Sequence, residues 1–343
     1  MSTKVSVIIP VYNAEQFIAQ CIESLLKQTL KECEFIFVND GSKDNSRKIV
    51  EKYQTIDERI KLINQENQGV SIARNNGLLI ATGKYIGFVD ADDYVRNDMY
   101  KVLFKTANES GCDVVLSNFE SEINGREVIV RYPFLKNRVH DRNYIEHEIL
   151  PYFLESEELN SVVNKLYKKE VINENNVKFP EKIALGEDGM FNIHFFSNAA
   201  TMQYIDYTGY YYREVIGSAT RNISEKDYFK RALEVYKSDL PDIYAKVDKS
   251  KISQLRSIKF VNSVFSYIHI YFVPSQEMNI RGRYKFVKSM IYNKEFRNAL
   301  SQYKNNENYN SLGRYEKSIF NLIQKKSIIG LYFLTAYSRF RNK

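Results

Sequence analysis

The sequence predicts an α/β protein with a parallel β-sheet in its first part and helices in its second. Two observations carry this prediction. Within the first ninety residues, four short apolar runs rich in β-forming residues alternate with amphipathic stretches, and after residue 221 no such alternation returns. Strands that alternate with helices form βαβ units with right-handed crossovers. A chain of 343 residues that is 44% hydrophobic can bury a large core. We therefore expect a large domain over residues 1–221 and a smaller helical region over 222–343.

The predicted strands are continuous apolar runs, which is typical of strands covered on both faces of a sheet. They span residues 5–12, 34–38, 59–63 and 85–89. Helices are expected between them. Asn13 is predicted as the N-cap of the first helix, with Gln16 three residues later. The second helix should open near Asp44, and the third should run over 70–81. A further strand is expected at 112–118.

Polar side chains follow all four predicted strands. In parallel sheets, ligands bind beyond the carboxyl ends of the strands, where the strand-to-helix loops converge. In chain order, these residues are Pro10, Tyr12 and Asn13; Asn39, Asp40, Gly41 and Ser42; Asn64, Gln65 and Asn67; and Asp90, Asp92 and Asp93. The chain has no G-x-G-x-x-G after the first strand and no G-x-x-x-x-G-K-[ST]. Neither a dinucleotide fingerprint nor a P-loop is therefore expected to hold phosphates.

The fourth predicted strand ends in the segment FVDADDYV, which carries Asp90, Asp92 and Asp93. Carboxylates this close together repel one another and raise each other's pKa unless a cation lies among them. Oxygen ligands suit Mg²⁺ or Mn²⁺. The segment therefore predicts a metal and phosphate site, with Arg74 at the start of the preceding helix as a further member. A solvated acidic turn that opens the next helix is the alternative.

A second acidic pair, Glu187 and Asp188, stands between Gly186 and Gly189 ahead of an apolar helical stretch. Acidic residues at the start of a helix are favoured by its dipole and by capping, which is an entirely structural explanation. The other interpretation is a general base. The pair taken alone leaves both open.

Four segments together resemble family-two glycosyltransferases of the GT-A fold: VSVIIPVYN at 5–13, FVNDGSKDNS at 37–46, GVSIARNNGLLIATGKYIGFVDADD at 69–93 and LGEDGMF at 185–191. The resemblance covers residues 3–220 and is closest to bacterial enzymes of capsule, exopolysaccharide and teichoic-acid synthesis. It implies a Rossmann-like mixed sheet. It also implies metal-dependent, inverting transfer of a sugar from a nucleotide-sugar, with UDP preferred, to a hydroxyl of a glycan or lipid-linked acceptor.

The resemblance also implies roles for individual residues. Asp40 would accept a hydrogen bond from the uracil imide, Asp90 would contact the ribose or donor sugar, and Asp92 would ligate Mn²⁺ or Mg²⁺. Arg74 would touch the donor sugar or phosphate, and Asp188 would be the catalytic base. Further nucleotide-sugar contacts are implied at Pro10, Tyr12, Asn67 and Ala91, acceptor contacts at Glu187, Lys165 and Tyr167, and diphosphate contacts at Arg213 and Ser218.

Structural alternatives accompany several of these roles. Asp40 could cap the helix that follows it, and Arg74 could be a surface ion-pair partner. Core packing and ordinary surface charge are alternatives for Lys165 and Tyr167.

Two other classes of function compete with the glycosyltransferase. A nucleotidyltransferase or other nucleotide-sugar enzyme would need a phosphate loop rich in Gly and Lys or Arg after the first strand, and VIIPVYNAE lacks one. A non-catalytic sugar-binding or scaffold protein of the same fold would be expected to have damaged acidic motifs, whereas both motifs are intact.

The balance of 49 Lys and Arg against 42 Asp and Glu gives a net charge of +7. This excess suits anionic membrane surfaces or phosphorylated, lipid-linked acceptors. No nucleic-acid-binding motif accompanies it, so no nucleic-acid partner is expected. The three cysteines lack CxxC spacing, and the four histidines lack a zinc pattern. No signal-peptide pattern opens the chain, so a cytoplasmic location is expected.

The last stretch, KKSIIGLYFLTAYSRFRNK at 325–343, has two interpretations. Its apolar part, 328–337, is too short to span a bilayer. Because basic residues flank it on both sides, an interfacial helix that brings the protein to the membrane surface is one interpretation. The other is a terminal helix docked on the core or on a second subunit of a homo-oligomer.

Overall fold

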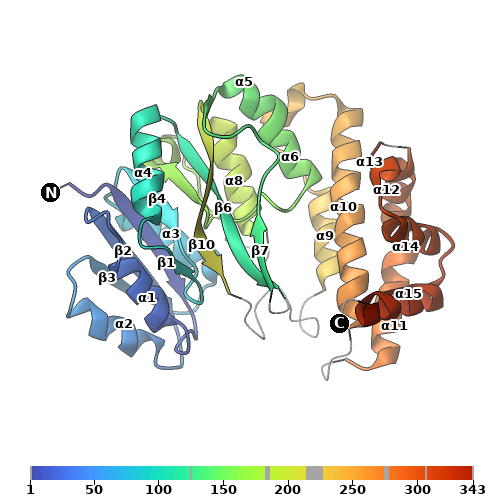
Figure 1. The fold of residues 1–343 in the computed structure, drawn as a ribbon, viewed down its shortest axis with the longest axis horizontal. Coiled ribbons are helices and arrows are strands. Elements are labelled where there is room, and N and C mark those ends of the chain that lie inside the picture. Colours follow the sequence, from blue (N-terminus) through green and yellow to red (C-terminus); the bar gives the residue numbers. More distant parts are fainter. Residues whose placement is uncertain are drawn as a thin grey trace. The chain divides into compact units, whose positions relative to one another are not determined.

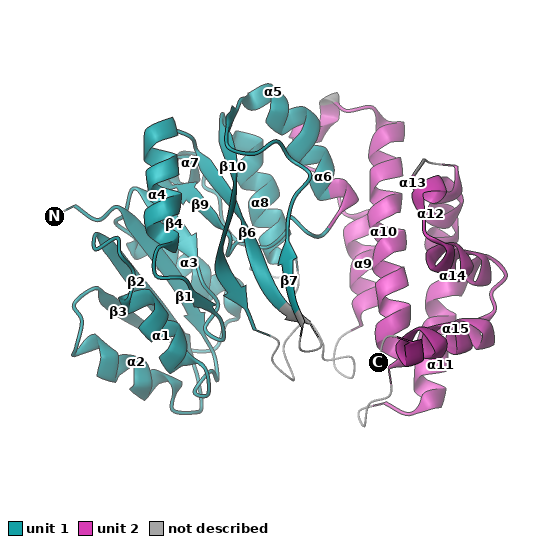
Figure 2. Cartoon of the chain, viewed as in Figure 1, with its two compact units in different colours: residues 1–153, 157–215 teal, residues 154–156, 216–343 magenta. Residues whose placement is uncertain are grey.

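A computed structural model describes residues 2–123, 126–181, 186–213, 227–273, 278–305 and 307–341. The chain divides into two compact units (Figure 2). The first comprises residues 1–153 and 157–215, and the second comprises 154–156 and 216–343. The domain boundary expected near 221 falls outside the described residues.

A ten-stranded mixed sheet forms the centre of the first unit (Figure 1). Its main path runs β3-β2-β1-β4-β9-β6-β10-β5, with β7 paired to β6 and β8 to β10. The strands are β1 (Val5–Val11), β2 (Cys33–Asp40), β3 (Ile60–Gln65), β4 (Tyr85–Phe88), β5 (Tyr94–Val95), β6 (Val114–Ile123), β7 (Arg126–Val130), β8 (Val139–His140), β9 (Lys165–Lys168) and β10 (Met202–Tyr212).

The four predicted amino-terminal strands are present, and β1 to β4 pair in parallel. The sheet becomes mixed at β9, which is antiparallel to both of its neighbours, β4 and β6. The mixed sheet implied by the resemblance is therefore confirmed. The carboxyl ends of β1, β2 and β4 lie at one edge of this sheet because these strands run in the same direction.

The helices of the first unit are α1 (Ile18–Leu26), α2 (Ser46–Gln54), α3 (Val70–Ile80), α4 (Met99–Ser110), α5 (Arg142–Tyr144), the π-helical turn η1 (Ile145–Ile149), α6 (Leu150–Glu155), α7 (Lys169–Glu174) and α8 (Glu187–Asn198). The end of α6 belongs to the second unit. Helix α3 packs closely on β1: a Cβ atom added to Gly77 would lie 2.4 Å from Cγ2 of Ile8, which is fully buried. This approach brings the second half of α3 close to the middle of β1.

Asn13 is not the N-cap of the first helix, so that prediction is wrong. Helix α1 begins only at Ile18, and no side chain caps it. Asn13 instead adopts a left-handed backbone conformation (φ 50°), which asparagine tolerates better than most residues. Its Oδ1 accepts a 2.8 Å hydrogen bond from the backbone N–H of Lys43. The side chain that was expected to cap a helix thus ties the loop after β1 to the loop after β2.

The second unit is built from helices, which confirms the predicted helical carboxyl-terminal region. They are α9 (Tyr228–Lys237), the 3₁₀ turn η2 (Asp242–Lys246), α10 (Lys249–Phe272), α11 (Ile280–Tyr292), α12 (Lys294–Lys304), α13 (Glu307–Ser311), α14 (Arg314–Gln324) and α15 (Ile328–Arg341). The longest, α10, packs against α9, α11, α12 and α15. Among the described helices, none has both the length and the apolar character needed to cross a bilayer.

Candidate active site

Asp40 lies at the end of β2 and is almost fully buried. Its Oδ1 accepts 2.8 Å hydrogen bonds from Nε2 of Gln65 and the backbone N–H of Gln68, and its Oδ2 accepts one from the N–H of Gly69. All three donors lie at the end of β3 or just before α3. The Asp40 side chain therefore does not cap α2, the helix that follows it, and instead holds the loop that leads into α3.

The other residues expected to contact the nucleotide lie along the same edge. Pro10 is half-buried near the end of β1, Tyr12 is exposed just beyond it, and Ala91 is buried after β4. Asn67 is exposed, and its Nδ2 donates a 3.1 Å hydrogen bond to the carbonyl oxygen of Asp40. A Cβ atom on Gly41 would lie only 2.8 Å from the backbone nitrogen of Asn67. The glycine thus permits the close contact between these two loops.

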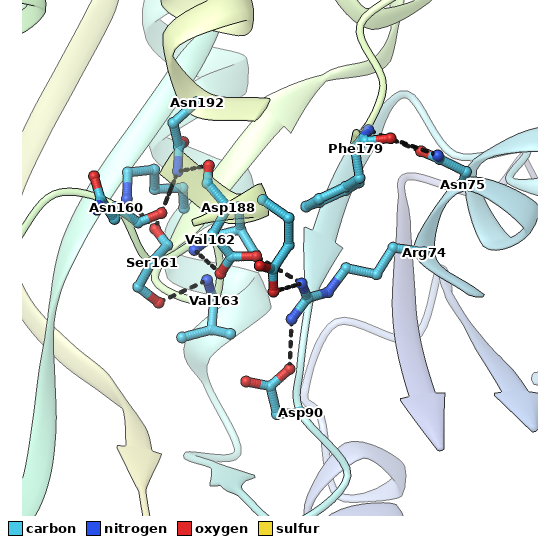
Figure 3. Close-up of polar contacts among 12 residues, drawn as sticks. Arg74, Asn75, Asp90, Asn160, Ser161, Val162, Val163, Phe179, Asp188 and Asn192 are labelled. Atoms are coloured by element: carbon cyan, nitrogen blue, oxygen red, sulfur yellow. Dashed lines mark hydrogen bonds and ion pairs between the residues drawn. The ribbon is translucent and has the colours of Figure 1, made fainter. Parts of the chain in front are cut away.

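Arg74, on the first turns of α3, joins the two acidic motifs (Figure 3). Its Nη2 donates a 2.9 Å hydrogen bond to Oδ1 of Asp90, and its Nη1 donates a 2.6 Å bond to Oδ1 of Asp188. Glu187 Oε1 lies 3.7 Å from the same Nη1. Arg74 is 4% exposed, so the surface ion pair considered as its alternative does not describe it. One buried cation therefore faces three carboxylates, which raise the pKa of its guanidinium further.

Asp188 stands in the first turn of α8, which Gly186 precedes in a left-handed conformation (φ 90°). Burial raises the pKa of Asp188 to about 6, although the adjacent Arg74 acts in the opposite direction. Its Oδ2 accepts a 3.3 Å hydrogen bond from the backbone N–H of Val162. Arg74 holds Oδ1, and within the described parts of the chain Oδ2 accepts one long hydrogen bond, so Oδ2 keeps a lone pair for another donor.

The side chain of Asn192 on α8 holds the loop over residues 159–162 close to Asp188. Nδ2 of Asn192, one helical turn after Asp188 on α8, donates to the carbonyl oxygens of Asn160 (2.6 Å) and Asp188 (3.0 Å). Sequence reasoning missed Asn192; its i+4 spacing from Asp188 was the available signal. A Cβ on Gly189 would lie 2.9 Å from the Asn160 side chain, so glycine allows the loop to approach α8.

Lys165 and Tyr167, expected as acceptor contacts, are fully buried on β9. The Lys165 ammonium donates to the carbonyl oxygens of Leu159 (3.0 Å) and Ser161 and to Oδ1 of Asn164 (3.2 Å), and burial lowers its pKa to about 7. The Tyr167 hydroxyl donates a 2.7 Å hydrogen bond to Oδ1 of Asn192. Lys165 therefore supports the 159–162 loop directly, and Tyr167 supports it through Asn192. Neither side chain is exposed to a ligand.

The neighbouring carboxylates of the acidic motif have different surroundings. Asp93 is fully buried and accepts hydrogen bonds from the Tyr210 hydroxyl (2.5 Å) and the backbone N–H of Arg213 (2.8 Å). Burial and the adjacent carboxylates raise its pKa well above the usual value. The Tyr210 hydroxyl also accepts a 3.2 Å hydrogen bond from the N–H of Asp90. Asp93 thus connects the motif to β10 rather than to a ligand.

Asp92 is half-buried, and burial together with the nearby Asp90 raises its pKa to about 6. Within the described part of the chain, no other residue donates a hydrogen bond or forms an ion pair with its carboxylate. An unpartnered carboxylate beside a second one fits a hard divalent cation. The described residues contain no group of three or more metal-ligating side chains placed around a common point. A cation at Asp92 would leave coordination positions that oxygen atoms of a bound diphosphate or water could fill.

Arg213 borders the acidic motif through its backbone bond to Asp93. Its guanidinium lies 5.1 Å from the ring centre of Phe17 and 5.4 Å from that of Tyr94, and it donates a 2.6 Å hydrogen bond to Oε1 of Gln20. A pocket lined by Gln20, Tyr94, Tyr211 and Arg213 opens at this point. Ser218 lies outside the described residues.

Comparisons with known proteins agree with this fold. Residues 6–175 match the family model described as Glycosyl transferase family 2. The chain is 40% identical over 216 residues to the uncharacterised glycosyltransferase EpsJ of Bacillus subtilis, a match that covers 63% of this chain and 62% of EpsJ. It is 31% identical over 273 residues to glycosyltransferase GlyG of Streptococcus pneumoniae, covering 78% of this chain and 88% of GlyG. The matched part is thus less than two thirds of EpsJ.

A solved structure also shares the fold. The crystal structure of S. aureus TarS 1–349 in complex with UDP-GlcNAc superimposes with a TM-score of 0.61 at 22% sequence identity. The match covers 98% of this chain and 91% of that one.

Proposed function

Since this chain belongs to glycosyl transferase family 2, we propose that it moves a sugar from a UDP-sugar to a hydroxyl group of a glycan or lipid-linked acceptor. We place this reaction in the cytoplasm and in the synthesis of a cell-surface polysaccharide. The observation that carries the proposal is the buried Arg74, which brings the carboxylates of Asp90 and Asp188 to one place although they belong to separate motifs. A donor site and a base for the acceptor are both required for transfer, and this arginine joins the residues proposed for each.

The uridine part of the donor is assigned to the loops at the ends of β1 and β2. Asp40 is proposed to meet the uracil imide, and Tyr12 and Asn67 are exposed beside it. The three donors around Asp40 fix the direction of its carboxylate before any ligand arrives. A charge-assisted hydrogen bond of this kind contributes about 1 to 3 kcal/mol. The choice of UDP also draws support from TarS, which was solved with UDP-GlcNAc.

Asp92 is the proposed protein ligand for Mn²⁺ or Mg²⁺, because its carboxylate is unpartnered within the described residues. A bound divalent ion would offset the negative charge that develops on the departing diphosphate. Asp90, held by Arg74, would contact the ribose or the sugar. Arg213 reaches the same region through its backbone bond to Asp93, and we retain it as a candidate diphosphate contact.

Asp188 is the proposed general base. As the acceptor oxygen bonds to the anomeric carbon, the bond from that carbon to the diphosphate oxygen breaks, and UDP leaves with the electron pair. The acceptor proton passes to Oδ2 of Asp188, the oxygen that Arg74 does not hold. A positioned base of this kind contributes about 10² to 10⁴ in rate. Because one displacement occurs on the face opposite the leaving group, the sugar configuration is inverted. Glu187, beside the base, remains the candidate acceptor contact.

The proposal is tested by screening nucleotide-sugars with and without Mn²⁺ for thermal stabilisation. A ligand at 100 times its dissociation constant adds about 2.7 kcal/mol to the free energy of unfolding. We expect UDP-sugars to stabilise the protein in a metal-dependent manner, and lack of such a shift contradicts the donor and metal assignments.

The products of the reaction then identify the reaction class. Release of UDP with a glycosylated acceptor supports transfer, release of pyrophosphate indicates a nucleotidyltransferase, and binding without turnover indicates a sugar-binding protein.

A further inference from the structure

Helix α15 presents aromatic and aliphatic side chains to solvent. Ile329, Phe333, Tyr337 and Phe340 are 65%, 65%, 61% and 79% exposed. Their spacing of four, four and three residues places them on one side of the helix. The residues that α15 buries, Ile328, Leu331 and Thr335, lie on the other side. A surface helix of a globular protein normally turns polar residues outward, so this outward stripe needs another explanation.

The charged side chains of α15 and of the turn before it have one sign. From residue 325 to 341 the chain has no Asp or Glu, whereas Lys325, Lys326, Arg339 and Arg341 are basic. Lys325 and Lys326 are exposed at the turn before α15, and Arg341 is exposed at its end. Basic residues therefore flank the apolar stripe at both ends of the helix.

Helix α11, which packs against α15, extends this surface. It also contains no acidic residue, and it exposes basic residues together with aromatic ones. The exposed residues of this kind are Arg281, Tyr284, Lys285, Lys288 and Tyr292. The two helices are linked because the ammonium of Lys326 lies 4.7 Å from the ring centre of Tyr292. We call these exposed residues of α11, α15 and the turn before α15 the basic-aromatic face. Figure 1 shows where the two helices lie in the fold.

We propose that the basic-aromatic face binds an anionic lipid surface. Aromatic rings are favoured at the boundary between headgroups and acyl chains, and the Lys and Arg side chains around them are attracted to anionic headgroups. Pairing of two copies through this face would bring together surfaces of the same charge, which opposes association. The sequence left an interfacial helix open beside a terminal helix docked on the core or on a second subunit. One side of α15 does pack on α10, α11 and α14. The exposed stripe on its other side and the exposed residues of α11 favour a lipid surface as a further contact.

The binding test uses the full chain and sedimentation with two kinds of vesicle, phosphatidylcholine alone and phosphatidylcholine mixed with phosphatidylglycerol. We expect the protein to sediment with the mixed vesicles and to be released by salt, because the attraction of surface charges is screened. The double variant Phe333→Ser/Phe340→Ser should bind at least about tenfold more weakly, since it loses buried apolar area in the interface. The double variant Lys325→Gln/Lys326→Gln should lose part of the binding at low salt.

Leu79→Ser is the matched control, because Leu79 is 76% exposed on α3 in the other unit. It should bind like the unaltered protein. All four substituted face residues are exposed, so the variants should stay folded, with at most a small fall in unfolding temperature where Lys326 loses its contact with the Tyr292 ring. Transfer to a soluble acceptor should not change. The transfer measurement separates this proposal from the proposed catalytic function. Equal sedimentation with both vesicle types, no sedimentation with either, or unaltered binding by the Phe333/Phe340 variant overturns the proposal. So does an oligomer that the same variant dissociates in size-exclusion chromatography.

Discussion

Nη1 of Arg74 lies 2.6 Å from Oδ1 of Asp188, which follows it by 114 positions in the chain. The two residues belong to α3 and α8, and the contact fixes the candidate base relative to the edge of the sheet where a nucleotide would bind. Nη2 of the same arginine holds Asp90, so the side chain has no freedom to release one carboxylate without disturbing the other.

Asp188→Asn should lower the transfer rate by at least about a hundredfold. Its amide oxygen can still accept the hydrogen bond from Arg74, so folding and donor binding should be preserved while the group can no longer take a proton. The rate is measured with saturating donor, and donor binding by thermal shift. Asp206→Asn, which alters an exposed ion pair with Lys136, is the matched control and should retain activity. Normal turnover by Asp188→Asn would remove Asp188 from the role of base.

Transfer should fall as the pH drops below about 6, because burial raises the pKa of Asp188 to about 6 and only its ionised form accepts a proton. We expect kcat/KM to decrease about tenfold for each unit of pH below that value. The measurement is a pH profile of kcat/KM at fixed Mn²⁺ concentration, with stability checked at each pH. A profile that stays flat down to pH 5 contradicts this role.

The raised pKa of Asp188 also makes the free energy of unfolding depend on pH. A carboxyl group whose pKa is higher in the folded than in the unfolded protein holds its proton longer when folded, so its contribution to the free energy of unfolding decreases as pH rises from about 4 to 6. Asp188→Asn removes this contribution. Relative to the unaltered protein, the variant should therefore gain stability across that window, by at most about 3 kcal/mol. Urea unfolding of both proteins at several pH values measures the difference.

Arg74→Met should destabilise the protein at pH 8 by about 3 kcal/mol, because it leaves Asp90, Glu187 and Asp188 without their shared cation. The loss should be smaller at pH 5, since burial raises the pKa of Asp188 to about 6 and its protonation removes one of the three negative charges. Urea unfolding at the two pH values checks both statements. A control is Arg47→Met, which removes an exposed ion pair with Glu51 and should have a small effect at either pH. An equal loss at pH 5 and pH 8 would argue against charge compensation as the role of Arg74.

Lys165→Met should impair the 159–162 loop. The substitution leaves the carbonyl oxygens of Leu159 and Ser161 without their buried donor, and the same loop provides the Val162 N–H that meets Asp188. We expect a loss of about 1 to 3 kcal/mol in stability, and a larger fall in transfer rate than in donor affinity. Lys168→Met is the control, because Lys168 lies at the partly exposed end of the same strand. Donor affinity that falls as much as the rate would place Lys165 closer to the nucleotide than the structure does.

The sequence predicted the elements that strong local patterns specify. It failed where contacts between residues far apart in the chain determine the conformation or burial of a side chain. Strands β1 to β4 are continuous apolar runs, so they were identifiable. Asn13 has the pattern of a helix cap, but a hydrogen bond from Lys43, thirty residues away, determines its conformation. For Lys165 and Tyr167 the sequence left acceptor contact and core packing both open, because nothing in a short polar-aromatic run shows that β9 pairs with strands on both sides; their full burial favours core packing. The pairing of Arg74 with Asp188 likewise has no local signature.

Asp92 and Asp93 are the clearest case in which the sequence does not show the surroundings of a side chain. Although these carboxylates are adjacent in one motif, replacing each with alanine should affect stability and metal binding in opposite ways. Asp93→Ala leaves the Tyr210 hydroxyl and the Arg213 N–H without an acceptor, so it should lower the free energy of unfolding by about 1 to 3 kcal/mol in the absence of metal. Asp92→Ala removes a carboxylate with no other residue bonded to it among the described ones, and burial together with Asp90 raises its pKa to about 6, so metal-free stability at neutral pH should not fall and should rise somewhat.

With Mn²⁺ and a UDP-sugar the order should reverse: Asp92→Ala should lose the metal-dependent thermal shift, and folded Asp93→Ala should keep it. Urea unfolding without metal and thermal shift with metal measure the two effects, each variant serving as the control for the other. If Asp92→Ala keeps the full metal-dependent shift, the ion is held elsewhere. If Asp93→Ala loses the metal-dependent shift while remaining folded, Asp93 would be a ligand of the ion and not only a contact to β10.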